Sequence, residues 1–382
     1  MMSVDDDLAA TVALSGLPGM GPSRLRSMVA ADAPSRTWER LAAGRPVVLD
    51  RPFPEIRAAE WSDALRADPA AILARHVVAG IGVARPGDPG YPGRLADEPD
   101  APAVLFSLGD PSAADAQHPA VAIVGTRRST AYGEGVARAL GAELAASGVT
   151  VVSGLALGID GAAHVGATST EVEGEGADPS GARRVAGPVA VVANGLDVVY
   201  PRRHRDLSAR VARLGAVLSE VPIGARPERW RFPLRNRLIA ALAPVLVVVE
   251  SARGGGSMHT VREADDRGRT VMAVPGPVTS AVSVGPNQLL VDGCAPCRDA
   301  DDVRIALGLS TMPSGARAPR RQSTLDEAAI LDAFAWTPAT VDQLAERSRL
   351  PLAQVSIALA DLVAAGEVVA RAGAFERSGT PR

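Results

Sequence analysis

The segment from Arg226 to Leu238 combines basic and aromatic side chains in a way that suits a nucleic-acid strand. Aromatic residues make up only 3% of the chain, yet Trp230 and Phe232 both lie here. Arginines neutralise phosphates and rings stack on bases, which is how proteins hold single strands of any sequence. The alternative is a solvated loop beside two core rings, but a local excess of positive charge in an acidic chain favours a function. The arginines of this segment are Arg226, Arg229, Arg231, Arg235 and Arg237.

A second candidate is the run that follows the apolar segment Val121–Val124 and precedes an alanine-rich helix. A glycine at a strand end permits a sharp turn, and the first turn of the next helix leaves unpaired N–H donors for an anion. Hydroxyls and fork-shaped guanidinium groups add further donors. The run matches neither the dinucleotide nor the nucleoside-triphosphate glycine pattern, and it has no lysine. It predicts a phosphate-binding loop of Gly125, Thr126, Arg127, Arg128 and Ser129.

Other predicted strand ends carry small and hydroxyl residues of the same kind. Ser153 and Gly154 follow the run Val149–Val152, and they make another turn with a hydroxyl. Gly256 and Ser257 end a glycine-rich stretch whose backbone N–H groups would form a nest for a phosphate. Several such loops along one sheet edge would hold several phosphates in a row, which is more than a mononucleotide needs.

Two pairs of reactive side chains have a structural alternative that we favour. Asp160 and His164 are four residues apart on a predicted helix and could form an acid–base pair, but no nucleophile accompanies them. Cys294 and Cys297 could be a redox pair, or part of a zinc site if about two more ligands lay nearby. We interpret the cysteines as small residues at a strand end, and we expect no metal and no cofactor.

The elements that would position these residues are apolar runs alternating with helical stretches between residues 81 and 308. Near-continuous valine-rich strands separated by helices indicate a parallel sheet covered on both faces, so an extended Rossmann-like, doubly wound α/β fold is expected. Ligands of such sheets bind beyond the carboxyl ends of the strands. The predicted strands are Val121–Val124, Val149–Val152, Val189–Val192, Ala216–Leu218, Val245–Val249 and Thr270–Val274.

A helical segment precedes this domain, an insertion interrupts it, and a linker and a second small domain follow it. Residues 1–75 are predicted to be helical, and glycines within Leu14–Leu25 indicate either a phosphate-binding helix–hairpin–helix or a simple packing turn. A polar, glycine-rich insertion is expected at residues 169–187 and a linker at 309–323. Residues 324–378 read as a winged helix, with Leu352–Ala364 in the recognition position. That helix has no basic residue, and the stretch from Arg321 to Arg377 holds eight acids against five arginines, so a protein-interaction or packing role is predicted.

Composition narrows the function class. The 382 residues carry a net charge of −3, so positive charge for nucleic acid must be local, and all 40 basic residues are arginine. That excess reflects either a GC-rich genome, which we favour, or a need for bidentate phosphate donors. No apolar run is long enough to span a membrane, and Asp5, Asp6 and Asp7 are the wrong charge for a secretory signal. A cytoplasmic location is therefore expected.

The ordered motifs between about residues 85 and 307 closely resemble the DprA/Smf family. The resemblance implies single-stranded-DNA binding, loading of the RecA recombinase in natural transformation and recombination, dimerisation through the Rossmann-like domain, and no catalysis. It also implies that Arg127 and the run Arg235-Asn236-Arg237 contact phosphates, with Phe232 placed for a base. The matching runs are Asp88–Pro92, Val121–Arg127, Val152–Leu155, Gly158–Asp160, Gly195–Pro201, Ser219–Gly224, Phe232–Arg237, Gly256–Thr260, Ala273–Gly276 and Gly285–Asn287.

The chain departs from the family pattern at two motif positions. Leu157 stands where the family usually has arginine, which removes one phosphate contact, and Thr126 replaces the commoner serine. These departures bear on affinity rather than on identity. The alternative is a nucleotide-binding enzyme like the phosphoribohydrolases named as lysine decarboxylases, with Glu263 as the nearest candidate for the catalytic glutamate. That chemistry has no use for the arginine-rich segment, so it ranks second.

Overall fold

The computed structural model describes residues 5–45, 47, 60–169, 187–309, 324–334, 338–371 and 373–377. The predicted linker lies outside these residues apart from Leu309, as does the predicted insertion apart from its two end residues. The chain divides into two compact units. The first unit comprises residues 1–120, 148–155 and 174–243, and the second comprises 121–147, 156–173 and 244–382.

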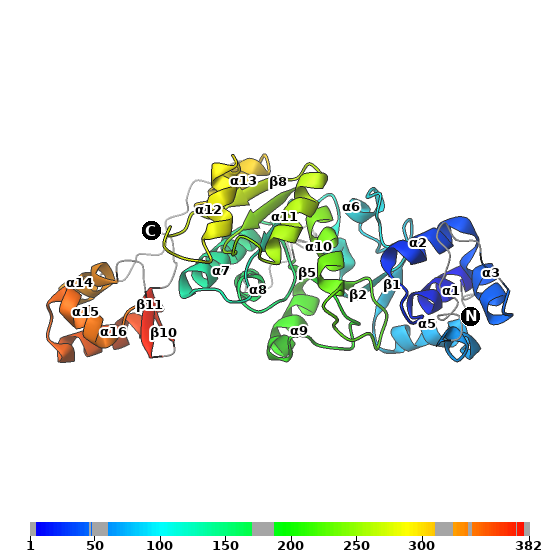
Figure 1. The fold of residues 1–382 in the computed structure, drawn as a ribbon, viewed down its shortest axis with the longest axis horizontal. Helices are drawn as coiled ribbons and strands as arrows, with labels where there is room; N and C mark the ends of the chain where they lie inside the picture. The colour runs from blue at the N-terminus through cyan, green and yellow to red at the C-terminus, as the bar shows by residue number, and fades with distance from the viewer. Residues whose placement is uncertain are drawn as a thin grey trace, which may run out of the picture. The chain divides into compact units, whose positions relative to one another are not determined.

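The first unit begins with a helical part in which α1 packs against α2, α3 and α5 (Figure 1). The side chain of Asp5 caps α1 by accepting from the N–H of Leu8, and proline starts each of the other three helices at a position where no N–H is needed. The four helices are α1 (Asp6–Ser15), α2 (Pro22–Ala31), α3 (Pro34–Ala42) and α5 (Pro69–Val78).

The strands of the first unit run in the order β1-β2-β6-β5-β4. β4, β5 and β6 are parallel, whereas β2 runs antiparallel to both β1 and β6. The strands are β1 (Gly82–Ala84), β2 (Leu105–Gly109), β4 (Thr150–Ser153), β5 (Val189–Val192) and β6 (Ala216–Ser219). The helices among them are α6 (Gly93–Ala96), α9 (Arg205–Leu214) and α10 (Arg231–Ala241), with 3-10 turns at Ala64–Arg66, Pro111–Ala114 and Arg202–His204.

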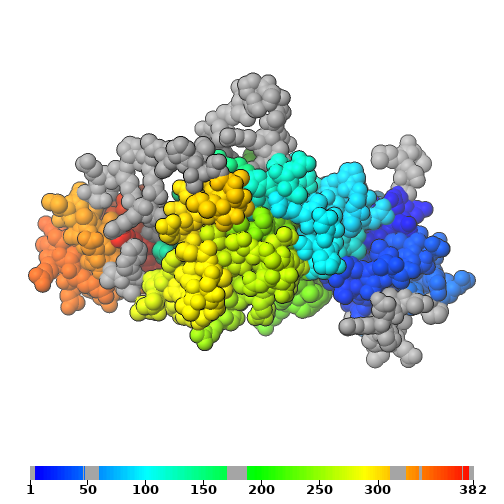
Figure 2. All heavy atoms as spheres, turned by 90° about the horizontal axis from the view of Figure 1, so that it is seen from above, coloured from blue at the N-terminus to red at the C-terminus, as the bar shows by residue number. Residues whose placement is uncertain are grey.

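The strands of the second unit run in the order β3-β7-β8-β9 and are all parallel. Gly141 and Gly166 let α7 and α8 pack closely, because a Cβ on either would collide with backbone of the facing helix. The residues of α11, α12 and α13 lie at the surface of this unit (Figure 2, yellow-green to gold). The elements are β3 (Ala120–Val124), α7 (Ala131–Ala146), α8 (Ile159–Ala167), β7 (Val245–Val248), α11 (Ser257–Asp266), β8 (Thr270–Ala273), α12 (Val284–Val291), β9 (Ala295–Pro296) and α13 (Ala300–Ala306).

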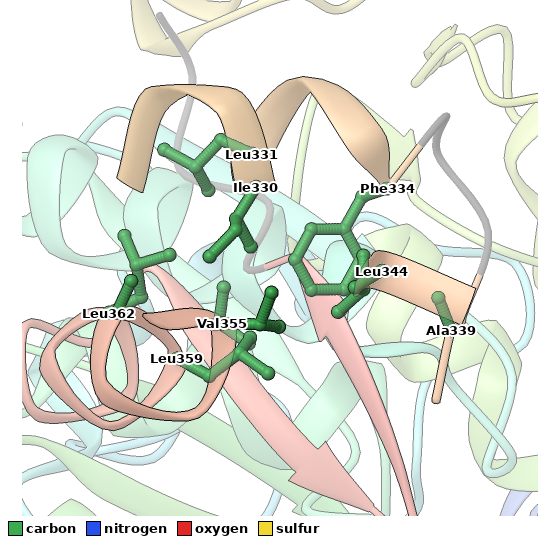
Figure 3. Packing of buried hydrophobic residues seen from close by; sticks show 10 residues of the cluster. Ile330, Leu331, Phe334, Ala339, Leu344, Val355, Leu359 and Leu362 are labelled. Carbon is green, nitrogen blue, oxygen red and sulfur yellow. The ribbon is translucent and has the colours of Figure 1, made fainter. Parts of the chain in front are cut away.

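The C-terminal part of the second unit is a winged helix with its own apolar core. Phe334 and Leu344 point into this core from α14 and α15, and Val355 and Leu359 meet them from α16 (Figure 3). Capping boxes start α14 at Thr324 and α15. The elements are α14 (Leu325–Ala333), α15 (Val341–Ser348), α16 (Leu352–Ala364), β10 (Val368–Arg371) and β11 (Ala374–Arg377), of which β10 and β11 form the wing.

The predicted fold class is confirmed: an extended Rossmann-like, mostly parallel α/β fold with an N-terminal helical domain and a C-terminal winged helix. Each of the predicted strands corresponds to one of β3 to β8, and β3 to β7 are buried along their whole length. The sequence interpretation missed β1, β2 and β9. In the part of the chain that the structure describes, none of the helices is long and apolar enough to cross a membrane.

Candidate nucleic-acid interface

The loop after β3 turns sharply at Gly125, where a Cβ would collide with Ile159 and the backbone of Glu250. The N–H of Thr126 donates to the carbonyl of Glu250 at 2.7 Å, and the N–H of Arg128 donates to the Thr126 hydroxyl at 3.2 Å. These bonds fix the backbone and leave the Arg127 and Arg128 side chains exposed. Ser129 is buried, and its hydroxyl donates to Glu134 at 2.7 Å. Within this predicted loop, the two arginines are the outward-facing cations.

The first turn of α7 does not present the unpaired donors that the sequence predicted. The Thr130 N–H donates to a carboxylate oxygen of Glu250 at 2.9 Å, and the Thr130 hydroxyl donates to the other oxygen. The Gly133 N–H donates to the Thr130 hydroxyl, and the Ala131 N–H donates to Glu376 at 2.8 Å. The expectation was therefore wrong for these donors, because carboxylates and a hydroxyl of the same chain already bind them. Burial raises the pKa of Glu250, while its bonds to Thr130 oppose that shift.

The loop after β7 lies at the same end of the second unit's sheet, because β3 and β7 are parallel neighbours with Val124 paired to Val248. Gly254 and Gly256 are exposed, as is Arg253. Ser257 is buried, and its hydroxyl donates to the Ser251 hydroxyl at 2.8 Å. The second unit thus places its two predicted phosphate loops side by side, and each offers exposed arginine.

The predicted residues of the first unit lie deeper. Ser153 and Gly154 are buried at the end of β4. Arg235 is only 6% exposed and donates to the carbonyl of Gly154 at 2.9 Å and to that of Val191. Carbonyl oxygens of two strand ends therefore hold its guanidinium group inside the unit.

Arg237 is also 6% exposed, and it forms ion pairs with Glu220 and, at 3.5 Å, with Asp100. Burial raises the pKa of Glu220 to about 7, and the adjacent Arg237 guanidinium opposes that shift. The prediction that Arg235 and Arg237 meet DNA phosphates is not supported by this geometry, because both guanidinium groups are enclosed and bound within the protein. The half-buried Asn236 lies between them in α10.

Exposed cationic and aromatic side chains do occur in this segment, but just before α10 and at its start. Arg226 and Arg229 are exposed, and Trp230 is 44% exposed. The Trp230 indole donates to Glu228 at 2.6 Å, and the Arg231 guanidinium lies 5.0 Å from the indole ring centre. Phe232 is half-buried, with its ring centre 5.9 Å from that of Tyr200.

We call Arg226, Arg229 and Trp230 the α10 entry surface. The predicted contact residues included none of the three, although all three lie in the basic and aromatic segment that the sequence singled out. A sequence signal separates this surface from the buried arginines, because Arg235 and Arg237 adjoin the apolar run Leu238–Leu242, whereas the entry surface precedes it.

A groove of about 780 Å³ lies between the turn that joins α1 to α2 and Trp230 of the α10 entry surface, all in the first unit. Gly19 has a φ of +70° in this turn, which the Trp61 indole holds by donating to the carbonyl of Pro18 at 2.9 Å. A turn between two helices is therefore present, as both interpretations of this stretch require, and contact between it and DNA stays a prediction. The groove is lined by residues 15–21 and 221–225 with Arg24, Glu228, Trp230 and Arg231.

The two pairs of reactive side chains and Glu263 are the remaining candidates for chemistry. Asp160 and His164 are buried in α8. Cys294 and Cys297 flank the short strand β9, and burial raises the pKa of Cys297 to about 12, which keeps that thiol protonated and disfavours redox chemistry. Among the described residues, no group of three or more His, Cys, Asp or Glu side chains is placed so that it could hold a metal ion. Glu263 lies on α11 and forms an ion pair with Arg267 at 2.6 Å.

Comparison with known proteins assigns the chain to a family. Residues 82–308 match the family described as DNA recombination-mediator protein A, and residues 314–374 match the DprA winged helix domain. The chain belongs to this DprA/Smf family of DNA-processing proteins.

Relatives and a solved structure align with most of the chain. The putative DNA processing protein DprA of Mycobacterium tuberculosis is 42% identical over 72% of this chain and 68% of its own length. Protein Smf of Escherichia coli is 34% identical over 75% of each chain. The X-ray structure of DprA from Streptococcus pneumoniae matches 81% of this chain and 100% of its own, with 25% identity and a TM-score of 0.59.

Proposed function

We propose that this chain binds single-stranded DNA through exposed arginines at strand-end loops and through the α10 entry surface. The observation that carries the proposal is the exposure of Arg127 and Arg128 on a loop whose backbone is fixed by hydrogen bonds. Exposed guanidinium groups on a fixed backbone suit phosphates, and the exposed Trp230 ring suits a base. Of the other predicted site residues, Gly256 is exposed on the loop after β7, whereas Ser153, Gly154 and Ser257 are buried.

We further propose that the bound strand is protected and handed to RecA in natural transformation and homologous recombination, and that the protein acts as a homodimer without catalytic turnover. Family membership supports these finer roles. Glu263, the candidate catalytic residue if the chain were an enzyme, forms an ion pair with Arg267, which gives it a structural role. The winged helix has no basic side chain on α16, which supports a role in packing or protein contact rather than in holding DNA.

The test is a fluorescence-anisotropy titration of the full chain with labelled oligo-dT, at roughly 50 and 200 mM salt. We expect the wild type to bind the single strand more tightly than a duplex of equal length. The variant Arg127→Ala/Arg128→Ala should bind more weakly, and its slope of log K against log salt should fall by about 1.4, since each single-strand phosphate contact contributes about 0.7.

The matched control is Arg138→Ala/Arg262→Ala, which removes the same charge from exposed positions more than a turn inside α7 and α11. It should bind like the wild type. Equal losses in both variants would mean that overall charge, and not the loop, controls affinity. No binding by the wild type would refute DNA binding for this chain, and nucleotide hydrolysis dependent on Glu263 would become the next activity to assay.

A further inference from the structure

The wing of the winged helix contacts the phosphate loop of the second unit. Glu376 on β11 accepts a hydrogen bond from the N–H of Ala131, the first residue of α7, at 2.8 Å. Arg371 on β10 donates to the carbonyl of Ser129 at 2.8 Å and to both carboxylate oxygens of Glu134 at 2.9 Å. The wing therefore binds the Ser129 carbonyl of the loop, and the first N–H and the Glu134 carboxylate of α7.

The wing holds these side chains in place through its own domain. Phe375 precedes Glu376, and its backbone exchanges two hydrogen bonds with Ala339, at 2.8 and 2.9 Å. Arg371 pairs with Ala374 across the wing. The acid and the arginine thus extend from a hairpin that backbone hydrogen bonds tie to the winged-helix core.

Glu376 binds a donor that suits a DNA phosphate. The start of the 16-residue helix α7 carries partial positive charge, and its free N–H groups bind anions. Since Glu250 and the Thr130 hydroxyl bind the neighbouring donors within the loop, the Ala131 N–H is the donor that a separate domain engages. Glu376 also adds a third carboxylate beside Glu134 and Glu250, which repels an approaching phosphate.

We propose that the wing is an internal competitor of DNA: Glu376 occupies the start of α7 as a phosphate mimic, and a bound single strand displaces it. The inference rests on the proposed function of the β3–α7 loop. The Arg371–Glu134 pair is partly exposed, with side-chain exposures of 42% and 28%, and such pairs contribute little to stability. A strand that engages several phosphates at once can therefore displace the wing.

The test compares full-length variants in oligo-dT titrations. Glu376→Gln/Arg371→Ala breaks the wing contact without changing the net charge, and we expect it to bind about three- to tenfold more tightly, because the competent state no longer competes with the wing-bound state. The control Asp361→Asn/Arg347→Ala makes the same charge changes on α16 and α15 of the same domain. It should match the wild type.

Hydrogen exchange separates displacement from simple repulsion. In the wild type, oligo-dT should speed exchange in residues 368–377, and in the wing variant it should leave them unchanged. If the wild type binds DNA but the wing variant binds no more tightly, or the wing shows no change on binding, the competition is refuted and the proposed function stands. If neither protein binds DNA, both proposals fail.

Discussion

Two pairs of arginines, each predicted to meet phosphates, have opposite surroundings in the structure. Arg127 and Arg128 extend from the loop after β3 and are exposed. Arg235 and Arg237 lie in α10, are 6% exposed and bind carbonyls or acids of their own unit. The contrast shows that an arginine cluster in a sequence marks positive charge but not the side of an element from which it projects. The first pair is suited to bind DNA and the second to hold the unit together.

The largest effect that would test this contrast is the loss of a buried ion-pair partner. Arg237→Ala leaves Glu220 enclosed without its cation, and breaking a buried pair in this way costs about 3–5 kcal/mol. We expect chemical denaturation at neutral pH to report a free energy of unfolding lower by that amount. Arg127→Ala should change it by less than about 0.5 kcal/mol, because the side chain is on the surface.

The pH dependence of this loss has a definite sign. Burial raises the pKa of Glu220 to about 7 in the folded protein, above its ordinary value near 4.5. Between these two pH values the folded state binds more protons than the unfolded state, so the folded protein loses stability as the pH rises from the lower value to the higher. Without Arg237 the pKa of Glu220 should rise further. The destabilisation by Arg237→Ala should therefore be smaller at pH 5.5 than at pH 8, and the reverse order would show that Glu220 is not the group responsible.

The sequence predicted the sheet well because its signal is local. Runs such as Val245–Val248 are apolar along their whole length, and only a strand buried on both faces needs that pattern. β9 spans two exposed residues and owes its assignment to backbone pairing with β8, so no side-chain period could reveal it. β2 was missed because Ser107 and Gly109 interrupt its apolar residues, so it lacks the continuous apolar pattern of the buried parallel strands.

The candidate site was less predictable because the residues that bind its hydrogen-bond donors are remote in the sequence. Glu250 and Glu376 reach the start of α7 from 120 and 245 residues beyond the groups that they bind. A strand-end glycine followed by a helix predicts donors, and it says nothing about which distant carboxylate takes them. The same limit explains Arg235, whose partners Gly154 and Val191 lie 81 and 44 residues away.

A smaller effect should separate the two aromatic residues of the same segment. Trp230 is 44% exposed, and stacking on a base typically contributes about 1–3 kcal/mol to binding. We expect Trp230→Ala to weaken oligo-dT binding by that amount in anisotropy titrations, with thermal unfolding nearly unchanged. Phe232→Ala is the matched comparison, and it should mainly affect stability because its ring is half-buried against Tyr200. Loss of DNA binding from Phe232→Ala alone would reverse the assignment.

The smallest effect tests whether exposure or sequence neighbourhood decides an arginine's role. Arg229 is only eight positions from Arg237, yet it is exposed, so it should behave like Arg127. We expect Arg229→Ala to leave the free energy of unfolding unchanged and to lower the slope of log K against log salt by about 0.7, the share of one single-strand phosphate contact. Arg213→Ala, at an exposed position on α9, removes the same charge and should leave the slope unchanged. An unchanged slope in Arg229→Ala would confine the DNA contact to the strand-end loops, because the arginine nearest the exposed ring would then meet no phosphate.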